Sequence, residues 1–146
     1  MPVPPLDARE MAAWHAFLRA HAVIMRRLEA DLQADHGLSL PAYEVLAHLS
    51  EAHGRRLRMS DLAECAVLTP SGLTRLIDKM AAEGLVERER DDADARVVYA
   101  VLLDAGFERV KAAYPTHLRG VREQLIDRLD KRELDALASS LGRFIE

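Results

Sequence analysis

Several features that mark whole classes of protein are scarce or missing in this chain of 146 residues. It has a single cysteine, Cys65, which excludes an intrachain disulfide framework and any metal site built from several thiolates. No apolar run approaches the roughly 18–20 residues that a transmembrane helix needs. The start of the chain also lacks the charged and apolar segments of a signal peptide. We therefore expect a cytoplasmic protein with no membrane partner.

An excess of positive charge is missing as well. The 20 Lys and Arg residues stand against 24 Asp and Glu residues, for a formal net charge of −4. Taken as one sum, this charge argues mildly against nucleic-acid binding. The cations are nearly all arginine, however, and five of them lie between Arg55 and Lys79 beside only three acidic residues. The sequence therefore predicts a positive field that is local to this segment.

What the chain does have is hydrophobic residues, 49% of the total, with Ala and Leu dominant and only 5% aromatic, which favours helices. Asp7 and Glu10 form a capping pair at the start of a long predicted helix that ends at Gly37. Apolar residues recur in it at alternating spacings of three and four, interrupted by one histidine: Met11, Trp14, Leu18, His21, Met25, Leu28 and Leu32. One chain of this size can hardly cover a seam of about 45 Å.

The middle of the chain changes from helical to strand periodicity. Ser39 and Thr69, each followed closely by a proline, are predicted helix caps. We expect helices over residues 39–54, 60–66 and 70–83, then a hairpin with strands at 85–90 and 96–103. Asp104 is predicted to cap a helix that runs to about residue 129, and Asp130 with Glu133 caps a last helix that carries Leu134, Leu137, Leu141, Phe144 and Ile145.

The order of these elements is that of a helix-turn-helix followed by a β-wing. The helix over residues 70–83 has one apolar stripe and one polar face. Small hydroxyls lie near its start and cations farther along, which suits phosphates and base edges in a DNA groove. Gly72 in its first turn permits a close backbone approach. The fold class we predict is mainly α with a small β-hairpin wing (α+β): a winged helix-turn-helix domain plus a helical dimerisation domain.

Four segments of this region resemble the MarR family of winged-helix regulators: LSLP at 38–41, SDLAE at 60–64, TPSGLTRLIDKM at 69–80 and EGLV at 83–86. The wing segment DAR at 94–96 and the junction VLLDAG at 101–106 are similar to the family's pattern too. Two positions depart from it. Ala95 stands where a second wing arginine is usual, and Leu103 replaces the junction threonine. The wing tip is also acidic, with Asp91, Asp92 and Asp94.

The resemblance implies a homodimer that binds a palindromic operator in double-stranded DNA. Residues 1–38 and 104–146 would form the dimerisation region, and residues 39–103 the DNA-binding domain. Expected dimer contacts are Met11, Trp14, Leu18, Leu134, Leu137, Leu141 and Phe144. Expected DNA-binding residues are Arg55, Arg58, Ser60, Thr69, Ser71, Gly72, Thr74, Arg75, Lys79, Arg88, Arg90, Asp94 and Arg96.

The resemblance also implies a repressor that a small aromatic or anionic ligand releases from DNA. A pocket for it is expected among Trp14, Phe17, His21, Met25 and Tyr43, all of which also suit simple packing. The acidic wing supports an alternative: a dimer of this fold that has lost DNA binding and acts as a protein-interaction or ligand-sequestering module. A metal or redox sensor is a third reading.

Signals for catalysis and for cofactors are absent from the sequence. There is no glycine-rich phosphate loop and no nucleophile elbow, so we expect no enzyme activity. The six histidines form no i, i+4 metal motif, and we expect neither a metal nor another cofactor. Cys65 is predicted to be a small buried hydrophobic residue.

Overall fold

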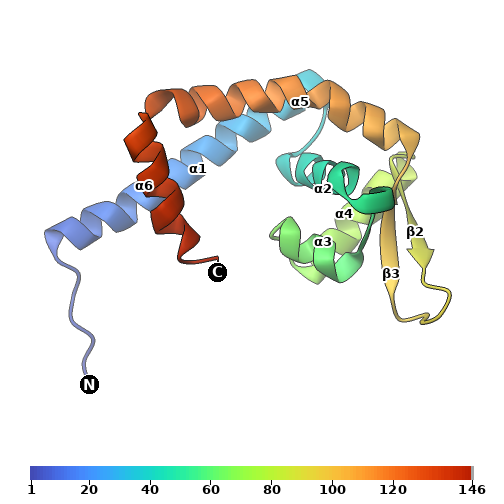
Figure 1. Cartoon of the computed structure of the whole chain (residues 1–146), viewed down its shortest axis with the longest axis horizontal. Coiled ribbons are helices and arrows are strands. Elements are labelled where there is room, and N and C mark those ends of the chain that lie inside the picture. The colour runs from blue at the N-terminus through green and yellow to red at the C-terminus, as the bar shows by residue number, and fades with distance from the viewer. Residues whose placement is uncertain (146) are drawn as a thin grey trace. The chain divides into compact units, whose positions relative to one another are not determined.

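The computed structural model describes residues 1–145, and the chain in this range is mainly helical with one small sheet (Figure 1). It divides into two compact units, one formed by residues 32–116 and the other by Met1–Asp31 and the chain from His117 onward. We call these the winged unit and the terminal unit. The predicted fold class, mainly α with a small β-hairpin wing, is confirmed.

The winged unit contains most of the elements. They are α2 (Leu40–Glu51), a 3-10 turn η1 (His53–Arg55), β1 (Arg56–Arg58), α3 (Met59–Cys65), α4 (Pro70–Ala82), β2 (Val86–Arg90), β3 (Val98–Leu102) and the first part of α5 (Asp104–Gln124). The terminal unit holds most of α1 (Ala8–His36), the end of α5, a 3-10 turn η2 (Ile126–Arg128) and α6 (Lys131–Gly142).

The core of the winged unit is a cluster of aliphatic side chains from α2, α3, α4 and the sheet. Among those with less than 2% exposure are Leu46, Leu49, Leu62, Leu73 and Ile77. The inward stripe predicted for residues 70–83 is confirmed, because Leu73, Ile77 and Met80 are buried while Leu76 packs at the edge. Burial of this stripe leaves the opposite, polar face of α4 in solvent.

Four of the predicted helix caps are present. The Ser39 hydroxyl accepts a hydrogen bond from the Ala42 amide at 3.1 Å, and the Thr69 hydroxyl accepts one from the Gly72 amide at 3.1 Å. The pairs Asp7–Glu10 and Asp130–Glu133 both form reciprocal capping boxes. Gly37 and Gly84 end their helices with φ of 63° and 75°, a conformation that glycine adopts without strain.

The sheet has three antiparallel strands in the order β1-β3-β2, rather than the two that the sequence predicted. Val86 pairs with Leu102 and Arg90 with Val98, so β2 and β3 form the expected hairpin. Beyond it, β1 pairs with the other edge of β3, with Arg58 opposite Tyr99. The sequence predicted no strand at residues 56–58, so β1 was missed. A strand of three residues has no readable alternation, and its pairing with β3 is a tertiary contact.

Three further expectations were wrong. Cys65 is exposed rather than buried, because the short helix α3 directs Leu62 and Ala63 to the core. Asp104 is the first residue of α5, not its cap, and its carboxylate lies 3.5 Å from the Arg55 guanidinium. The helix predicted to reach residue 129 ends at Gln124, and η2 follows before α6. Apolar spacing continued past the end of the helix and hid this break.

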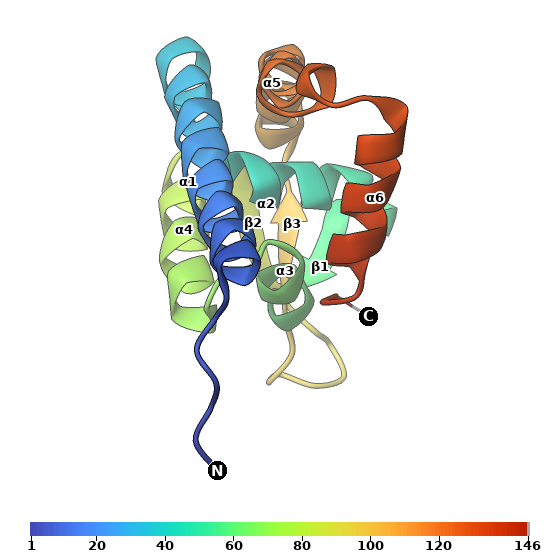
Figure 2. The same cartoon turned by 90° about the vertical axis from the view of Figure 1, so that its left-hand side faces the viewer.

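In the terminal unit, α1 and α5 pack closely at Gly120, where an added Cβ would come within 2.7 Å of Leu28. The chain turns through η2 into α6, drawn in red in Figure 2. Within residues 1–145, none of the helices is both long enough and apolar enough to cross a membrane. Many large apolar side chains of this unit remain exposed, among them Trp14 and Phe17 at 50% each and Phe144 at 83%.

Candidate DNA interface

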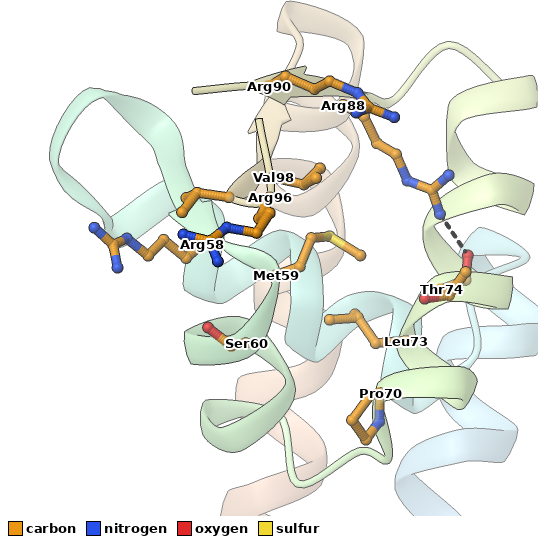
Figure 3. Close-up of a pocket in the computed structure, with 11 residues that line it drawn as sticks. Arg58, Met59, Ser60, Pro70, Leu73, Thr74, Arg88, Arg90, Arg96 and Val98 are labelled. Carbon is orange, nitrogen blue, oxygen red and sulfur yellow. Dashed lines mark hydrogen bonds between the residues drawn. The ribbon is translucent and has the colours of Figure 1, made fainter. Parts of the chain in front are cut away.

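The winged unit has a cavity of about 680 Å³ between α3, α4 and the hairpin (Figure 3). Its lining includes four arginines: Arg58, Arg88, Arg90 and Arg96. No carboxylate is among the lining residues that the structure describes. Ser60 and Thr74 add hydroxyls, and Met59, Pro70, Leu73, Val97 and Val98 complete the wall. The hollow is therefore a cationic surface in a chain of negative net charge.

Six of the predicted DNA-binding residues meet in this cavity: Arg58, Ser60, Thr74, Arg88, Arg90 and Arg96. The sequence indicated these residues by charge and by their place in the motif. It missed the apolar part of the wall, because Met59, Val97 and Val98 carry no chemical signal of their own. Only the pairing of β1 with β3 brings them to one place.

The start of α4 borders the cavity and presents the other predicted residues. Thr69 and Ser71 are exposed, with their hydroxyl oxygens 3.4 Å apart. Gly72 also leaves room for the helix cap, since an added Cβ would lie 3.0 Å from the capping hydroxyl of Thr69. Arg75 and Lys79 are exposed farther along the same face. Among residues 1–145, neither of these two cations forms an ion pair within the chain.

The acidic wing tip is organised by its own hydrogen bonds. The Asp91 carboxylate accepts from the amides of Ala93 and Asp94, at 3.2 and 3.0 Å. The Asp94 carboxylate binds the Arg96 guanidinium at 3.1 and 3.3 Å and accepts from the Arg96 amide at 3.0 Å. These bonds, first from the side chain and then from the backbone of Arg96, lower the pKa of Asp94. Asp94 thus holds Arg96, whose side chain is 92% exposed, at the wing tip.

Tyr99 of β3 contacts two arginines of β1, Arg56 and Arg58. A hydrogen bond with the Tyr99 side chain raises the pKa of Arg58. The Arg56 guanidinium stacks over the Tyr99 ring at 4.1 Å and pairs with Glu89 of β2 at 3.0 Å. The sequence did not single out Tyr99, which takes this role because β3 is the central strand.

Arg88 differs from the other arginines of the cavity. Its Nη2 lies 2.8 Å from the Asp78 carboxylate and donates to the Thr74 carbonyl oxygen at 3.2 Å. Both acceptors belong to residues of α4, and Figure 3 shows the bond to Thr74. By contrast, the Arg90 bond to the Ala95 carbonyl at 3.5 Å stays within the wing.

Arg55 lies apart from these residues and is not among the residues that line the cavity. Its guanidinium stacks over the Phe107 ring at 3.8 Å and lies 3.5 Å from the Asp104 carboxylate. Its φ of 53° is rare for a residue with a side chain. These contacts connect η1 to the start of α5.

A second, smaller cavity of about 230 Å³ lies between α2 and α5 within the winged unit. It is lined by Tyr43, Ala47, Ser50, Glu51, Phe107, Val110, Lys111 and Tyr114. Tyr43 is only 4% exposed, and burial, with the nearby Glu44 carboxylate as the next cause, raises its pKa to about 12. Of the five predicted ligand residues, Tyr43 lines this cavity. Trp14, Phe17, His21 and Met25 belong to the terminal unit, where the Trp14 and Phe17 rings stack at 6.2 Å.

Residues that could hold a metal are not grouped in the described part of the chain. No three His, Cys, Asp or Glu side chains among residues 1–145 come together in a way that could bind one.

Comparison with known proteins places this geometry in a family. A model of the MarR family matches residues 36–97. The HTH-type transcriptional regulator YkoM of Bacillus subtilis is 30% identical over 109 residues, which cover 75% of this chain and 69% of YkoM.

Two solved structures from Streptomyces coelicolor match almost the whole chain. AbsC, a MarR family transcriptional regulator, has a TM-score of 0.92 and 36% identity and covers 98% of this chain and 96% of its own. Sco3205, another MarR family regulator, was solved in complex with DNA. It has a TM-score of 0.92 and 31% identity, and the match covers 99% of this chain and 89% of Sco3205. The chain therefore belongs to the MarR family of winged-helix transcriptional regulators, which are DNA-binding regulators and not enzymes.

Proposed function

We propose that this chain is a sequence-specific DNA-binding repressor that acts as a homodimer on a palindromic operator. The cavity lined by four arginines between α4 and the hairpin carries the proposal. It is concave, cationic and bordered by the exposed start of a helix, which together suit a DNA backbone. Sco3205, which has the same fold, is known in complex with DNA, and this supports the same partner here.

The expected DNA contact of each residue follows from where its side chain lies. Ser71, Thr74 and Arg75 on the exposed face of α4 would meet base edges in the major groove. Arg96, held by Asp94 at the wing tip, would enter the adjacent minor groove. The remaining contacts would be to phosphates, from Arg58, Ser60, Lys79 and Arg90. Arg55, stacked on Phe107, would serve the fold instead.

A second copy of this chain is the partner that the terminal unit suits best. Met11, Trp14, Leu18, Leu141 and Phe144 expose 39% or more of their surface, while Leu134 and Leu137 are half-buried. An apolar seam of this length on an isolated chain is costly in water, and a two-fold partner presents the same seam to it. Two DNA-binding units related by a two-fold axis would then require a palindromic operator.

Phe144→Glu tests the dimer. Placing a charge at an apolar side chain that is 83% exposed should not disturb folding, but it should weaken association of two copies. Sedimentation should show a dimer for the wild-type chain and a shift toward monomer for the variant. A wild-type chain that sediments as a monomer at micromolar concentration would contradict the proposal.

The cavity between α2 and α5 supports the proposal that a small ligand releases the protein from DNA. Aromatic rings from Tyr43, Phe107 and Tyr114 line it beside the Lys111 ammonium group, a combination that suits a small aromatic acid. Benzoate and salicylate are suitable probes. We expect them to weaken operator binding by the wild-type chain, and Lys111→Gln to reduce this effect. Lys111 lies outside the cationic cavity, so its removal should leave binding without ligand unchanged.

Arg75→Ala tests sequence-specific DNA binding. The operator is first located by footprinting the region upstream of the chain's own gene. If Arg75 reads a base, the variant should lose about 1–3 kcal/mol of operator affinity, measured by fluorescence anisotropy. Arg27→Ala, which removes an exposed arginine from α1, is the matched control and should bind like the wild type. No protection at any site would favour the alternative, a dimer of this fold that acts without DNA.

A further inference from the structure

We propose that Arg88 is a positioning residue for α4 that sets operator specificity, and not one of the phosphate-binding cations. This inference rests on the proposed DNA-binding function and assigns a different role to one arginine of the same cavity. Its basis is the pair of contacts that one guanidinium nitrogen makes with α4, to the Asp78 carboxylate at 2.8 Å and to the Thr74 carbonyl at 3.2 Å.

The geometry makes Arg88 a cross-link between two elements. Arg88 lies in the middle of β2, whose partner strand β3 is the centre of the sheet. Thr74 and Asp78 lie four residues apart on α4 and therefore one above the other on the same side of the helix. Both bonds start from one guanidinium nitrogen and reach neighbouring acceptors, because the carbonyl oxygen of Thr74 points along the helix toward residue 78. Together they hold this point of α4 against the hairpin and restrain rotation of the helix about its axis. A single ion pair would restrain this rotation less well.

The charges of the pair explain why Arg88 suits positioning better than phosphate binding. Asp78 lies on the polar face of α4, where an unpaired carboxylate would repel DNA. Its side chain is 58% exposed, and that of Arg88 is 39% exposed. In the pair the two charges cancel, so Arg88 offers DNA no net charge. Arg96 also pairs with an aspartate, Asp94, but its side chain is 92% exposed, so exposure and not the pairing leaves it better placed to reach a phosphate.

The consequence for recognition is direct. Thr74 is both a predicted base-contacting residue and an acceptor for Arg88, and Arg75 is its neighbour in the chain. A helix free to rotate would carry both side chains away from their base edges. Loss of Arg88 should therefore reduce discrimination between operator and random DNA more than it reduces affinity for DNA in general.

The test compares Arg88→Gln, Asp78→Asn and the double variant with Arg90→Gln as the matched control on the same strand. Affinities for operator and random duplexes are measured at several salt concentrations. Arg88→Gln and Asp78→Asn should each lower the operator-to-random affinity ratio by about 10-fold. The double variant should lose no more than either single variant and keep the wild-type salt slope. Arg90→Gln should weaken both duplexes equally and reduce the slope by about 1.

Three results would overturn the inference. The first is that Arg88→Gln behaves like Arg90→Gln, so that the operator-to-random affinity ratio is kept and the salt slope is reduced. The second is that the losses of affinity ratio in the two single variants add in the double variant, since additivity would mean that Arg88 and Asp78 act separately. The third comes from the chain without DNA. Amide hydrogen exchange across α4 should become several-fold faster in both single variants. Unchanged exchange would exclude a positioning role for Arg88. If the wild-type chain binds neither duplex, the proposed function fails, while the exchange measurement still decides whether Arg88 holds α4.

Discussion

At the scale of single residues, Val67 has the most strained backbone of the helix-turn-helix. It lies in the turn between α3 and α4 with φ of 55°, a conformation that β-branched residues rarely adopt, and its side chain is 89% exposed. Val67→Gly should therefore raise the free energy of unfolding by about 1 kcal/mol in a urea titration. Val67→Ala keeps a Cβ and is the control. Equal stability of the two variants would show that the turn is not strained.

Tyr43 gives a residue-scale prediction about pH. Burial raises its pKa from 10.0 to about 12, so the folded chain holds this proton at a pH where the unfolded chain loses it. The stabilising effect is complete below pH 10 and is lost as the pH rises toward 12. Between these values the free energy of unfolding should fall by up to about 2–3 kcal/mol more for the wild type than for Tyr43→Phe. Parallel curves for the two chains would contradict the shift.

At the scale of elements, local signals in the sequence were enough for most of the fold. Ser39, Thr69 and the Asp130–Glu133 pair mark helix starts because the capping partners lie within three residues. The strand β1 and the end of α5 at Gln124 were not predictable in this way. The first depends on pairing with β3, and the second falls within an unbroken apolar spacing. The same reasoning applies to the candidate site, where charge indicated the arginines but not their pairing with Asp78 or Tyr99.

The junction between β3 and α5 yields the prediction at this scale. A Cβ on Gly106 would collide with the Leu85 carbonyl oxygen and lie 2.6 Å from Leu102 Cδ1. Gly106→Ala should therefore lower the free energy of unfolding by about 1–3 kcal/mol through overpacking. Gly142→Ala places the same methyl group where nothing lies within 4 Å and should be neutral or stabilising. Chemical denaturation of both variants decides the point, and equal effects would refute the close packing.

At the scale of the whole molecule, a net charge of −4 coexists with a cationic cavity. The sequence located the positive segment between Arg55 and Lys79, but the cavity adds arginines from the hairpin, which only the fold brings alongside α4. Association with DNA depends on the field at the contact surface and not on the sum over the chain. The two-fold partner proposed for the terminal unit would double this surface on one operator.

The salt dependence of operator binding tests the central claim most directly. Arg58, Arg75, Lys79, Arg90 and Arg96 are exposed in each chain, so a dimer has enough cations to displace counterions from many phosphates. Between about 50 and 200 mM salt, operator affinity should fall by about 1,000-fold or more, linearly on logarithmic axes. An affinity that stays nearly constant over this range would show that the cationic cavity is not where this protein meets DNA.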